Sequence, residues 1–252
     1  MEKIVHRISF FISAVLLYML SAYLYLSYKG FVYQDGDFVL ISNANAGLLD
    51  GLNTKEEESQ PFALPVKKDV AFNWPRKLIA GQDDAPLSIY EFSSLGCTHC
   101  ADFHLNILPK LEDNYISTGK INVAFVHFPL DKRSMQVAMI AECFEGQKRS
   151  DFITLAFSKQ REWGLAVDPT NYFINYGVMN GLKPAEVEKC MKNDETAKEI
   201  LFNRQEAIDK LKIQGTPAFL VSSENKNEII YGISNINELK GYLDKRLSEE
   251  EK

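Results

Sequence analysis

Two cysteines three positions apart offer the most specific chemistry in this sequence. Cys97 and Cys100 end the stretch 91–100, in which an apolar run leads into a Cys-x-x-Cys pattern. Side chains at positions i and i+3 of a helix lie on one face, close enough for a disulfide to form without rebuilding the backbone. The spacing therefore predicts a pair that cycles between a dithiol and a disulfide.

The two cysteines are expected to differ in reactivity. Cys97 falls in the first turn of a predicted helix, where free backbone N–H groups and the positive end of the helix dipole favour a thiolate. His99 can add a positive charge or a hydrogen bond, whereas Cys100 lies further into the helix and is expected to be buried and protonated. Cys97 is thus the predicted nucleophile and Cys100 the predicted resolving thiol.

A Cys-x-x-Cys pattern also occurs in zinc sites and as a pair of inert thiols. Zinc usually takes a second pair of ligands at similar spacing, but Cys143 and Cys190 stand singly, although His99 and His104 could complete a site. His104 lies on an apolar helix face, which favours a core histidine. The strand-turn-helix context favours redox chemistry, so we expect no metal and no cofactor besides the Cys97–Cys100 disulfide itself.

The N-terminal segment determines the expected compartment. Lys3 and Arg7 precede residues 8–27, an uncharged run of about the length that crosses a bilayer as a helix. The slight positive-inside bias places the N-terminus in the cytoplasm and the rest of the chain outside. A cleaved signal peptide is the alternative, although the run is long and no clear Ala-x-Ala site follows it. Residues 1–29 are therefore predicted to be a membrane anchor or signal segment, and the protein to be periplasmic or extracytoplasmic and tethered to the inner membrane.

The remaining composition predicts one domain and excludes one class of partner. The 252 residues carry 28 Lys and Arg against 34 Asp and Glu, which gives a net charge of −6 and no basic surface for nucleic acid. Residues 30–75 are predicted to form an extended spacer with one short strand at 37–42. This spacer could instead carry an oligomerisation element. Residues 76–252 are expected to form the globular domain.

The expected elements of the domain describe an α/β fold with a mixed β-sheet. Strands are predicted at 70–74, 87–92, 121–128, 218–221 and 228–231, of which the second and third form a parallel βαβ unit and the last two a hairpin. A helix is predicted from Cys97 to Ser117, kinked at Pro109. Residues 133–212 read as an inserted helical subdomain, and residues 235–247 as a closing helix followed by a frayed tail at 248–252.

Together these features resemble the DsbA-like family of thiol-disulfide oxidoreductases, which have a thioredoxin fold with a helical insertion. The resemblance covers residues 77–247. It rests on the strand that leads into Cys97-Thr98-His99-Cys100, on Glu91 six residues before Cys97, on the insertion, and on Gly215-Thr216-Pro217 before a strand. The joint pattern is specific, although a Cys-x-x-Cys alone is not.

The resemblance implies roles for residues outside the cysteine pair. Glu91 would be a buried acid that moves protons to and from Cys100, although a structural acid that reaches the surface is the alternative. Thr216 and Pro217 would form a cis-proline loop that holds an extended client chain, although a trans proline at a strand start is commoner. His99 would tune Cys97.

The implied function is an exported oxidase that introduces disulfides into cysteine-containing client proteins. The partner that the family implies is a quinone-linked membrane protein of the DsbB type, which would re-oxidise the cysteine pair. The alternative partner is a reductase. Thr98 and Thr216 stand where the best-known oxidases often carry Pro and Val. A disulfide isomerase or reductase on the same scaffold therefore stays open, as does a peptide-binding chaperone without catalysis.

Cys143 and Cys190 fall in separate helical stretches of the insertion. In an exported protein they are predicted to form a structural disulfide, whereas buried free thiols are the alternative.

Overall fold

The computed structural model describes residues 31–34, 37–40, 62–67, 77–233 and 235–250. The chain divides into two compact units, Met1–Glu57 and Glu58–Lys252. In the first unit, β1 (Phe31–Gln34) and β2 (Asp37–Leu40) pair as an antiparallel hairpin, and β2 matches the strand predicted at 37–42.

Two predictions concern residues that the structure does not describe. The anchor or signal segment at 1–29 and the strand at 70–74 both lie outside the described residues. Among the described residues, no helix is both long enough and apolar enough to span a membrane.

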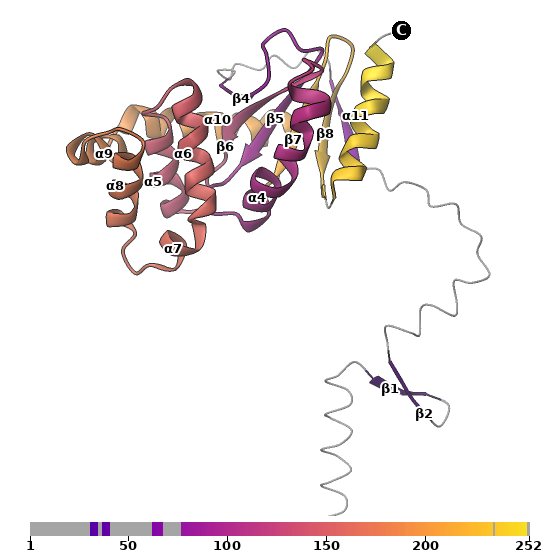
Figure 1. Cartoon of the computed structure of the whole chain (residues 1–252), viewed down its shortest axis with the longest axis horizontal. Helices are drawn as coiled ribbons and strands as arrows, with labels where there is room; N and C mark the ends of the chain where they lie inside the picture. The colour runs from indigo at the N-terminus through magenta and orange to yellow at the C-terminus, as the bar shows by residue number, and fades with distance from the viewer. Residues whose placement is uncertain (1–30, 35–36, 41–61, 68–76, 234, 251–252) are drawn as a thin grey trace, which may run out of the picture. The chain divides into compact units, whose positions relative to one another are not determined.

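The second unit is built on a six-stranded mixed sheet (Figure 1). The strand order is β3-β8-β7-β5-β6-β4, and among these pairs β5 and β6 alone run parallel. The strands are β3 (Phe62–Val66), β4 (Leu78–Ala80), β5 (Leu87–Ser93), β6 (Ile121–His127), β7 (Ala218–Ser222) and β8 (Asn227–Tyr231). The predicted parallel pair and the predicted hairpin are confirmed.

Helices cover both faces of the sheet, as the alternating residues of β7 show. Phe219 and Val221 pack in a cluster with the helical segment after Cys97 and with α11 (Ile236–Glu250). Ala218 and Leu220 pack in a second cluster, with residues of α10 (Asp194–Leu211). Because successive side chains of a strand point to opposite faces, β7 must be apolar throughout, and its first four residues are all buried.

The helical segment after Cys97 is irregular rather than one kinked helix. A five-residue α-helix, α4 (Thr98–Asp102), is followed by a π-helical turn at Phe103–Ile107, a 3₁₀ turn at Leu108–Leu111 and a second π-helical turn at Glu112–Ile116. Pro109 lies in the 3₁₀ turn, where its missing N–H cannot join a regular ladder. The change of hydrogen-bond pattern is thus spread over three turns.

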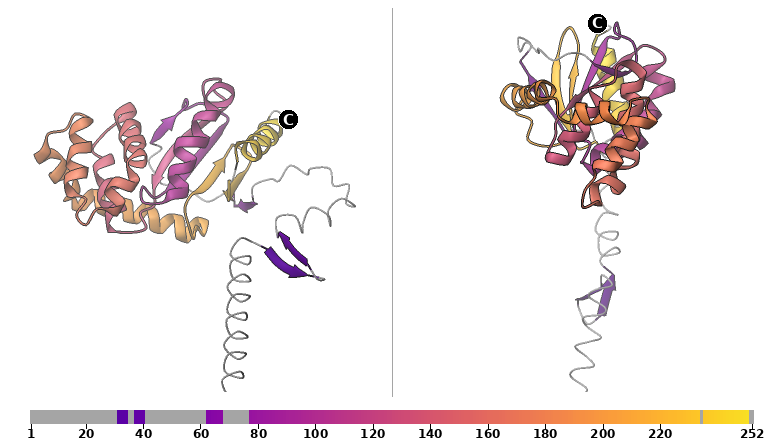
Figure 2. Two further views of the ribbon diagram at one scale, coloured as in Figure 1. Left: turned by 60° about the horizontal axis from the view of Figure 1, so that its bottom comes forward. Right: turned by 90° about the vertical axis from the view of Figure 1, so that its left-hand side faces the viewer.

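Most of the predicted insertion lies at one end of the sheet, from which its last helix, α10, runs back along the sheet, whereas α11 lies at the other end (Figures 1 and 2). The insertion comprises α5 (Lys132–Ala141), α6 (Gly146–Ser158), α7 (Gln160–Leu165), α8 (Thr170–Met179), α9 (Pro184–Met191) and α10. Gly146 begins α6, Pro169 precedes α8 and Gly181 follows it, while two further breaks, at Lys159 and at 192–193, have no glycine or proline. A disulfide joins Cys143, just after α5, to Cys190 in α9.

The structure differs from the sequence prediction at both borders of the domain. Strand β3 lies within the predicted spacer at 30–75, yet it pairs antiparallel with β8, so the sheet begins before residue 76. Pro65 interrupts the strand pattern of this segment and is tolerated because β3 is an edge strand. At the other border, α11 continues to Glu250, so the predicted fraying from Ser248 is wrong.

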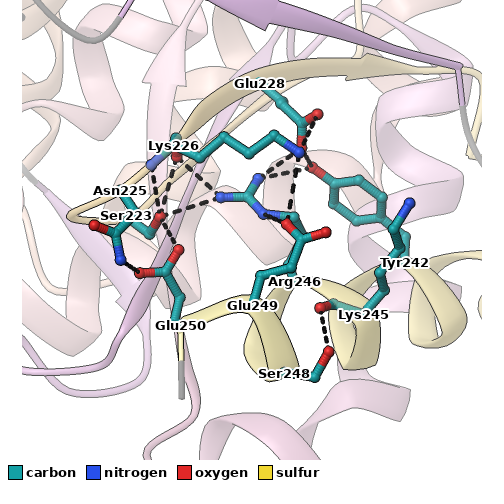
Figure 3. Close-up of polar contacts among 10 residues, drawn as sticks. All are labelled: Ser223, Asn225, Lys226, Glu228, Tyr242, Lys245, Arg246, Ser248, Glu249 and Glu250. Atoms are coloured by element: carbon teal, nitrogen blue, oxygen red, sulfur yellow. Dashed lines mark hydrogen bonds and ion pairs between the residues drawn. The ribbon is translucent and has the colours of Figure 1, made fainter. Parts of the chain in front are cut away.

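A buried arginine explains why the end of α11 stays helical (Figure 3). Arg246 is 1% exposed, and its guanidinium donates to the Glu228 carboxylate at 2.8 Å and to the Lys226 carbonyl oxygen at 2.9 Å. Glu250 accepts a hydrogen bond from the Ser223 hydroxyl at 2.6 Å. These bonds fasten α11 to the turn between β7 and β8.

Candidate active site

Strand β5 delivers Cys97 through a tight turn. The Cys97 N–H donates to the Ser94 carbonyl oxygen at 2.9 Å, and the Cys97 carbonyl oxygen accepts from the Ala101 N–H at 3.1 Å. Cys97 is therefore the N-cap residue of α4, with an extended backbone and with its side chain over the first helical turn. This agrees with the predicted position at the helix start.

The groups around the Cys97 sulfur together favour its ionised form. Its Sγ accepts a hydrogen bond from the Cys100 N–H at 3.4 Å, and when protonated the thiol donates to the Thr216 carbonyl oxygen at 3.4 Å. The hydrogen bond with the Cys100 side chain, and smaller contributions from Thr216 and from the first-turn N–H groups, outweigh burial and lower the Cys97 pKa to about 5. Cys97 is half-buried, so an incoming sulfur can reach it.

Cys100 lies below Cys97 and has the opposite character. It is fully buried, and both cysteines are free thiols. Burial raises the Cys100 pKa far above its ordinary value, and the hydrogen bond to Cys97 and the charge of Glu91 act in the same direction. One helical turn thus holds a half-buried thiolate above a fully buried thiol.

The loop before β7 lies directly against Cys97. The Thr216–Pro217 peptide bond is cis, and the Thr216 carbonyl lies against Cys97. A groove of about 510 Å³ runs beside the loop and is lined by His99, Asp102, Gly215, Thr216, Pro217, Tyr231, Gly232 and Ile233. The structure therefore brings together Cys97, Cys100, His99 and the Thr216–Pro217 loop.

Glu91 lies beneath the site in β5. Its side chain is fully buried, and neither carboxylate oxygen has a hydrogen-bond partner among the described residues. His104 is one ionisable neighbour, with Nδ1 at 3.9 Å from Glu91 Oε2, while its Nε2 lies 3.0 Å from the Thr154 hydroxyl of α6. The alternative of an acid that reaches the surface does not hold, and His104 is a buried histidine that touches this acid.

The structure also bears on the zinc alternative. His99 is exposed on the groove, whereas His104 faces Glu91 and Thr154, so the two histidines do not converge on the cysteines. Within the described part of the chain, no group of three His, Cys, Asp or Glu residues is placed to hold a metal ion.

One residue that touches the active-site turn gave no signal in the sequence. Gln160, the first residue of α7, donates from its side-chain amide to the carbonyl oxygens of Leu95 and Cys97. A lone glutamine 63 residues after Cys97 in an amphipathic helical stretch has no local pattern that would reveal this contact.

Comparisons with known proteins agree with this geometry. The family model described as Thioredoxin matches residues 74–245. A chain from Rickettsia prowazekii, whose description includes the words "protein-disulfide oxidoreductase", is 26% identical over 203 residues, which is 80% of this chain and 72% of that one. "Probable disulfide bond formation protein D" of Bacillus cereus is 26% identical over 230 residues, 87% of this chain and 96% of that one.

A solved structure shows the same fold. The crystal structure of alpha-DsbA1 from Wolbachia pipientis superimposes with a TM-score of 0.65 at 29% sequence identity, over 73% of this chain and 96% of that chain. The chain belongs to the thioredoxin family, and within it to the DsbA-like thiol-disulfide oxidoreductases.

Proposed function

We propose that this chain is an exported dithiol oxidase that introduces disulfides into secreted or periplasmic proteins. The observation that carries the proposal is the unequal cysteine pair. Cys97 has a pKa of about 5, whereas Cys100 is buried and its pKa is raised. A thiolate that is stable at neutral pH favours the reduced form of the enzyme over its disulfide. The Cys97–Cys100 disulfide would therefore pass readily to client proteins.

The proposed reaction transfers two electrons from client to enzyme. A client thiolate attacks Cys97 Sγ of the enzyme disulfide, so a mixed disulfide forms and Cys100 leaves as a thiolate that takes up a proton. A second client thiolate then attacks the client sulfur of the mixed disulfide. The client disulfide forms, Cys97 leaves as a stabilised thiolate, and the enzyme is left reduced.

The surrounding residues have distinct roles in this proposal. The cis Thr216–Pro217 loop holds the client chain in an extended form beside Cys97, and the groove receives its side chains. Glu91 supplies and accepts the proton of Cys100, which is supported by its full burial and its lack of hydrogen-bond partners among the described residues. His99, exposed at the rim of the groove, adjusts the charge around Cys97.

An oxidation assay tests the proposal. The full-length oxidised chain should oxidise a reduced, unfolded protein with two cysteines, and Cys97→Ser should abolish this activity. The redox potential of the pair, measured against glutathione, should lie closer to the value of about −120 mV for a strong oxidant than to about −270 mV for a thioredoxin. A potential near the thioredoxin value would contradict an oxidase role and favour a reductase.

A disulfide isomerase is the second candidate function. Thr216 supports it, because isomerase-type relatives commonly carry Thr before the cis proline. An isomerase should restore activity to scrambled ribonuclease faster than it oxidises reduced ribonuclease, and light scattering should show an oligomer. A peptide-binding chaperone, by contrast, should retain its cellular role when Cys97 is replaced by Ser.

The proposed direction of reaction requires a re-oxidising partner, and the N-terminal segment suggests where the chain acts. An oxidase must be re-oxidised, and we propose a quinone-linked membrane protein of the DsbB type as the electron acceptor. Residues 1–29 would tether the domain to the inner membrane on its extracytoplasmic side. Membranes that contain quinone should re-oxidise the reduced chain, and the chain should stay with the membrane fraction after a high-salt wash. Recovery of the intact chain in the cytoplasmic fraction would contradict this location.

A further inference from the structure

Several side chains of the helical insertion lie beside the active-site turn, and one of them, Gln160, donates to two carbonyl oxygens of the turn. Gln160 is 8% exposed, and its Nε2 lies 2.7 Å from the Leu95 carbonyl oxygen and 2.9 Å from the Cys97 carbonyl oxygen. These two carbonyls flank Gly96, which is exposed and has the widest conformational freedom of any residue in the turn. The amide therefore bridges the turn on both sides of its most flexible residue.

The Gln160 hydrogen bonds lie next to the backbone groups that stabilise the Cys97 thiolate. The Cys97 carbonyl also accepts the first α-helical hydrogen bond of α4, from Ala101. A second donor on this carbonyl fixes the peptide plane at the start of α4. That plane precedes the first helical turn, whose Cys100 N–H points at Cys97 Sγ.

Helix α7 is itself held rigidly against its neighbours. The indole N–H of Trp163 donates to the Ala156 carbonyl oxygen of α6 at 2.9 Å, and Trp163 is 1% exposed. The guanidinium of Arg133 in α5 donates to the Gly164 carbonyl oxygen at 2.5 Å. Gln160 is thus a short side chain on a firmly placed helix, as a group that positions another residue requires.

We propose that Gln160 is a positioning residue through which the helical insertion sets the reactivity of Cys97. This role rests on the proposed thiol-disulfide exchange. It assigns a function in that exchange to a residue outside the client groove. Without the bridge, the turn around Gly96 relaxes and the Cys100 N–H moves away from Cys97 Sγ. The thiolate then loses part of its stabilisation, so the Cys97 pKa rises.

A neutral substitution separates this effect from direct electrostatics. The charged and titratable groups around the site include Glu91 in β5, His99, Cys100 and Asp102 in α4, His104 beside Glu91, Asp131, Lys132 and Arg133 at the start of α5, and Tyr231 in β8. Gln160→Met keeps the side-chain length and adds no charge to this set. A shift in the Cys97 pKa then cannot come from a change of net charge.

The test is a pH titration of the thiolate absorbance near 240 nm on the full-length reduced chain. We expect Gln160→Met to raise the Cys97 pKa by about 0.5 to 1, since hydrogen bonds and dipoles at a helix start contribute up to about that much. The equilibrium with glutathione should shift toward the disulfide form by about 3- to 10-fold, which is the same change expressed as a ratio. Gln205→Ala is the matched control, because the Gln205 amide bonds to the exposed Asp209 in α10.

The outcomes separate positioning from a purely structural role. If Gln160 only satisfied two buried carbonyls, Gln160→Met would be less stable to urea but would keep the wild-type thiolate titration and glutathione equilibrium, and the proposal would be wrong. Gln160→Asn retains the amide on a shorter chain and serves if the Met variant does not fold; an unchanged titration in the Asn variant also overturns the proposal. Both readouts need no client protein, so they are independent of whether the wild-type chain acts as an oxidase.

Discussion

The low pKa of Cys97 predicts that the reduced protein loses stability as the pH falls through about 5. A group whose pKa is lowered on folding stabilises the folded state fully above its ordinary pKa, and this contribution disappears as the pH falls through the folded pKa. For Cys97 the two limits are 9.0 and about 5. The contribution should therefore be absent at pH 4, partial at pH 7 and complete above pH 9.

The size of the effect follows from the same two values. A pH of 7 lies about two units above the pKa of Cys97 in the folded state. At about 1.36 kcal/mol per unit, ionisation of Cys97 then contributes at most about 2.7 kcal/mol to the free energy of unfolding. Cys97 is only half-buried, so solvent screening reduces the contribution to about 1–2 kcal/mol. Cys100 stays protonated over this range because burial raises its pKa, so it adds no slope.

Urea unfolding of the dithiol form at pH 4 to 8 measures this contribution. Cys97→Ser is the control, because serine is similar in size to cysteine but its hydroxyl does not ionise near neutral pH. The free energy of unfolding of the wild type minus that of Cys97→Ser should be constant below pH 5 and rise by about 1–2 kcal/mol toward pH 7. A difference that stays flat from pH 4 to 8 would refute the argument that the first turn of α4 holds Cys97 as a thiolate.

Three further predictions follow from other contacts. Glu91→Gln should slow disulfide exchange with glutathione in stopped-flow measurements by about 10- to 100-fold, because the buried thiol loses its proton acceptor; unchanged rates would exclude this role. Replacement of both Cys143 and Cys190 by Ala should lower the free energy of unfolding by about 4 kcal/mol, from the chain entropy of a loop that spans 47 positions; a change below 1 kcal/mol would contradict it. Arg246→Met should cost about 3–5 kcal/mol in urea unfolding, since it leaves Glu228 buried without its guanidinium, and a second change of Glu228→Gln should restore part of the loss.

The parts of the site that the sequence predicted are those encoded locally. Cys97 and Cys100 are three positions apart, and their different environments follow from where each falls in one helical turn. Pro217 and Glu91 were assigned through the family resemblance, from Gly215-Thr216-Pro217 before a strand and from an acid six positions before Cys97. Each of these needs only a few neighbouring residues to be recognised.

The parts that the sequence did not predict depend on distant pairing. Strand β4 has three residues and forms only because β6 offers an edge to Leu78 and Ala80. Strand β3 contains Pro65, which in isolation argues against a strand, and it is stabilised by pairing with β8. Gln160 acts on a turn 63 residues earlier in the chain. Such contacts are set by the completed fold and leave no local pattern.

The arrangement of the site separates how reactive Cys97 is from which client it meets. The client groove is lined by α4, by the cis-proline loop and by the residues after β8, whereas Gln160 reaches Cys97 from the insertion. A substitution on the insertion can therefore change the Cys97 pKa while the groove keeps its shape. A substitution at Tyr231 or Ile233 can change client binding while the bonds of Gln160 stay intact.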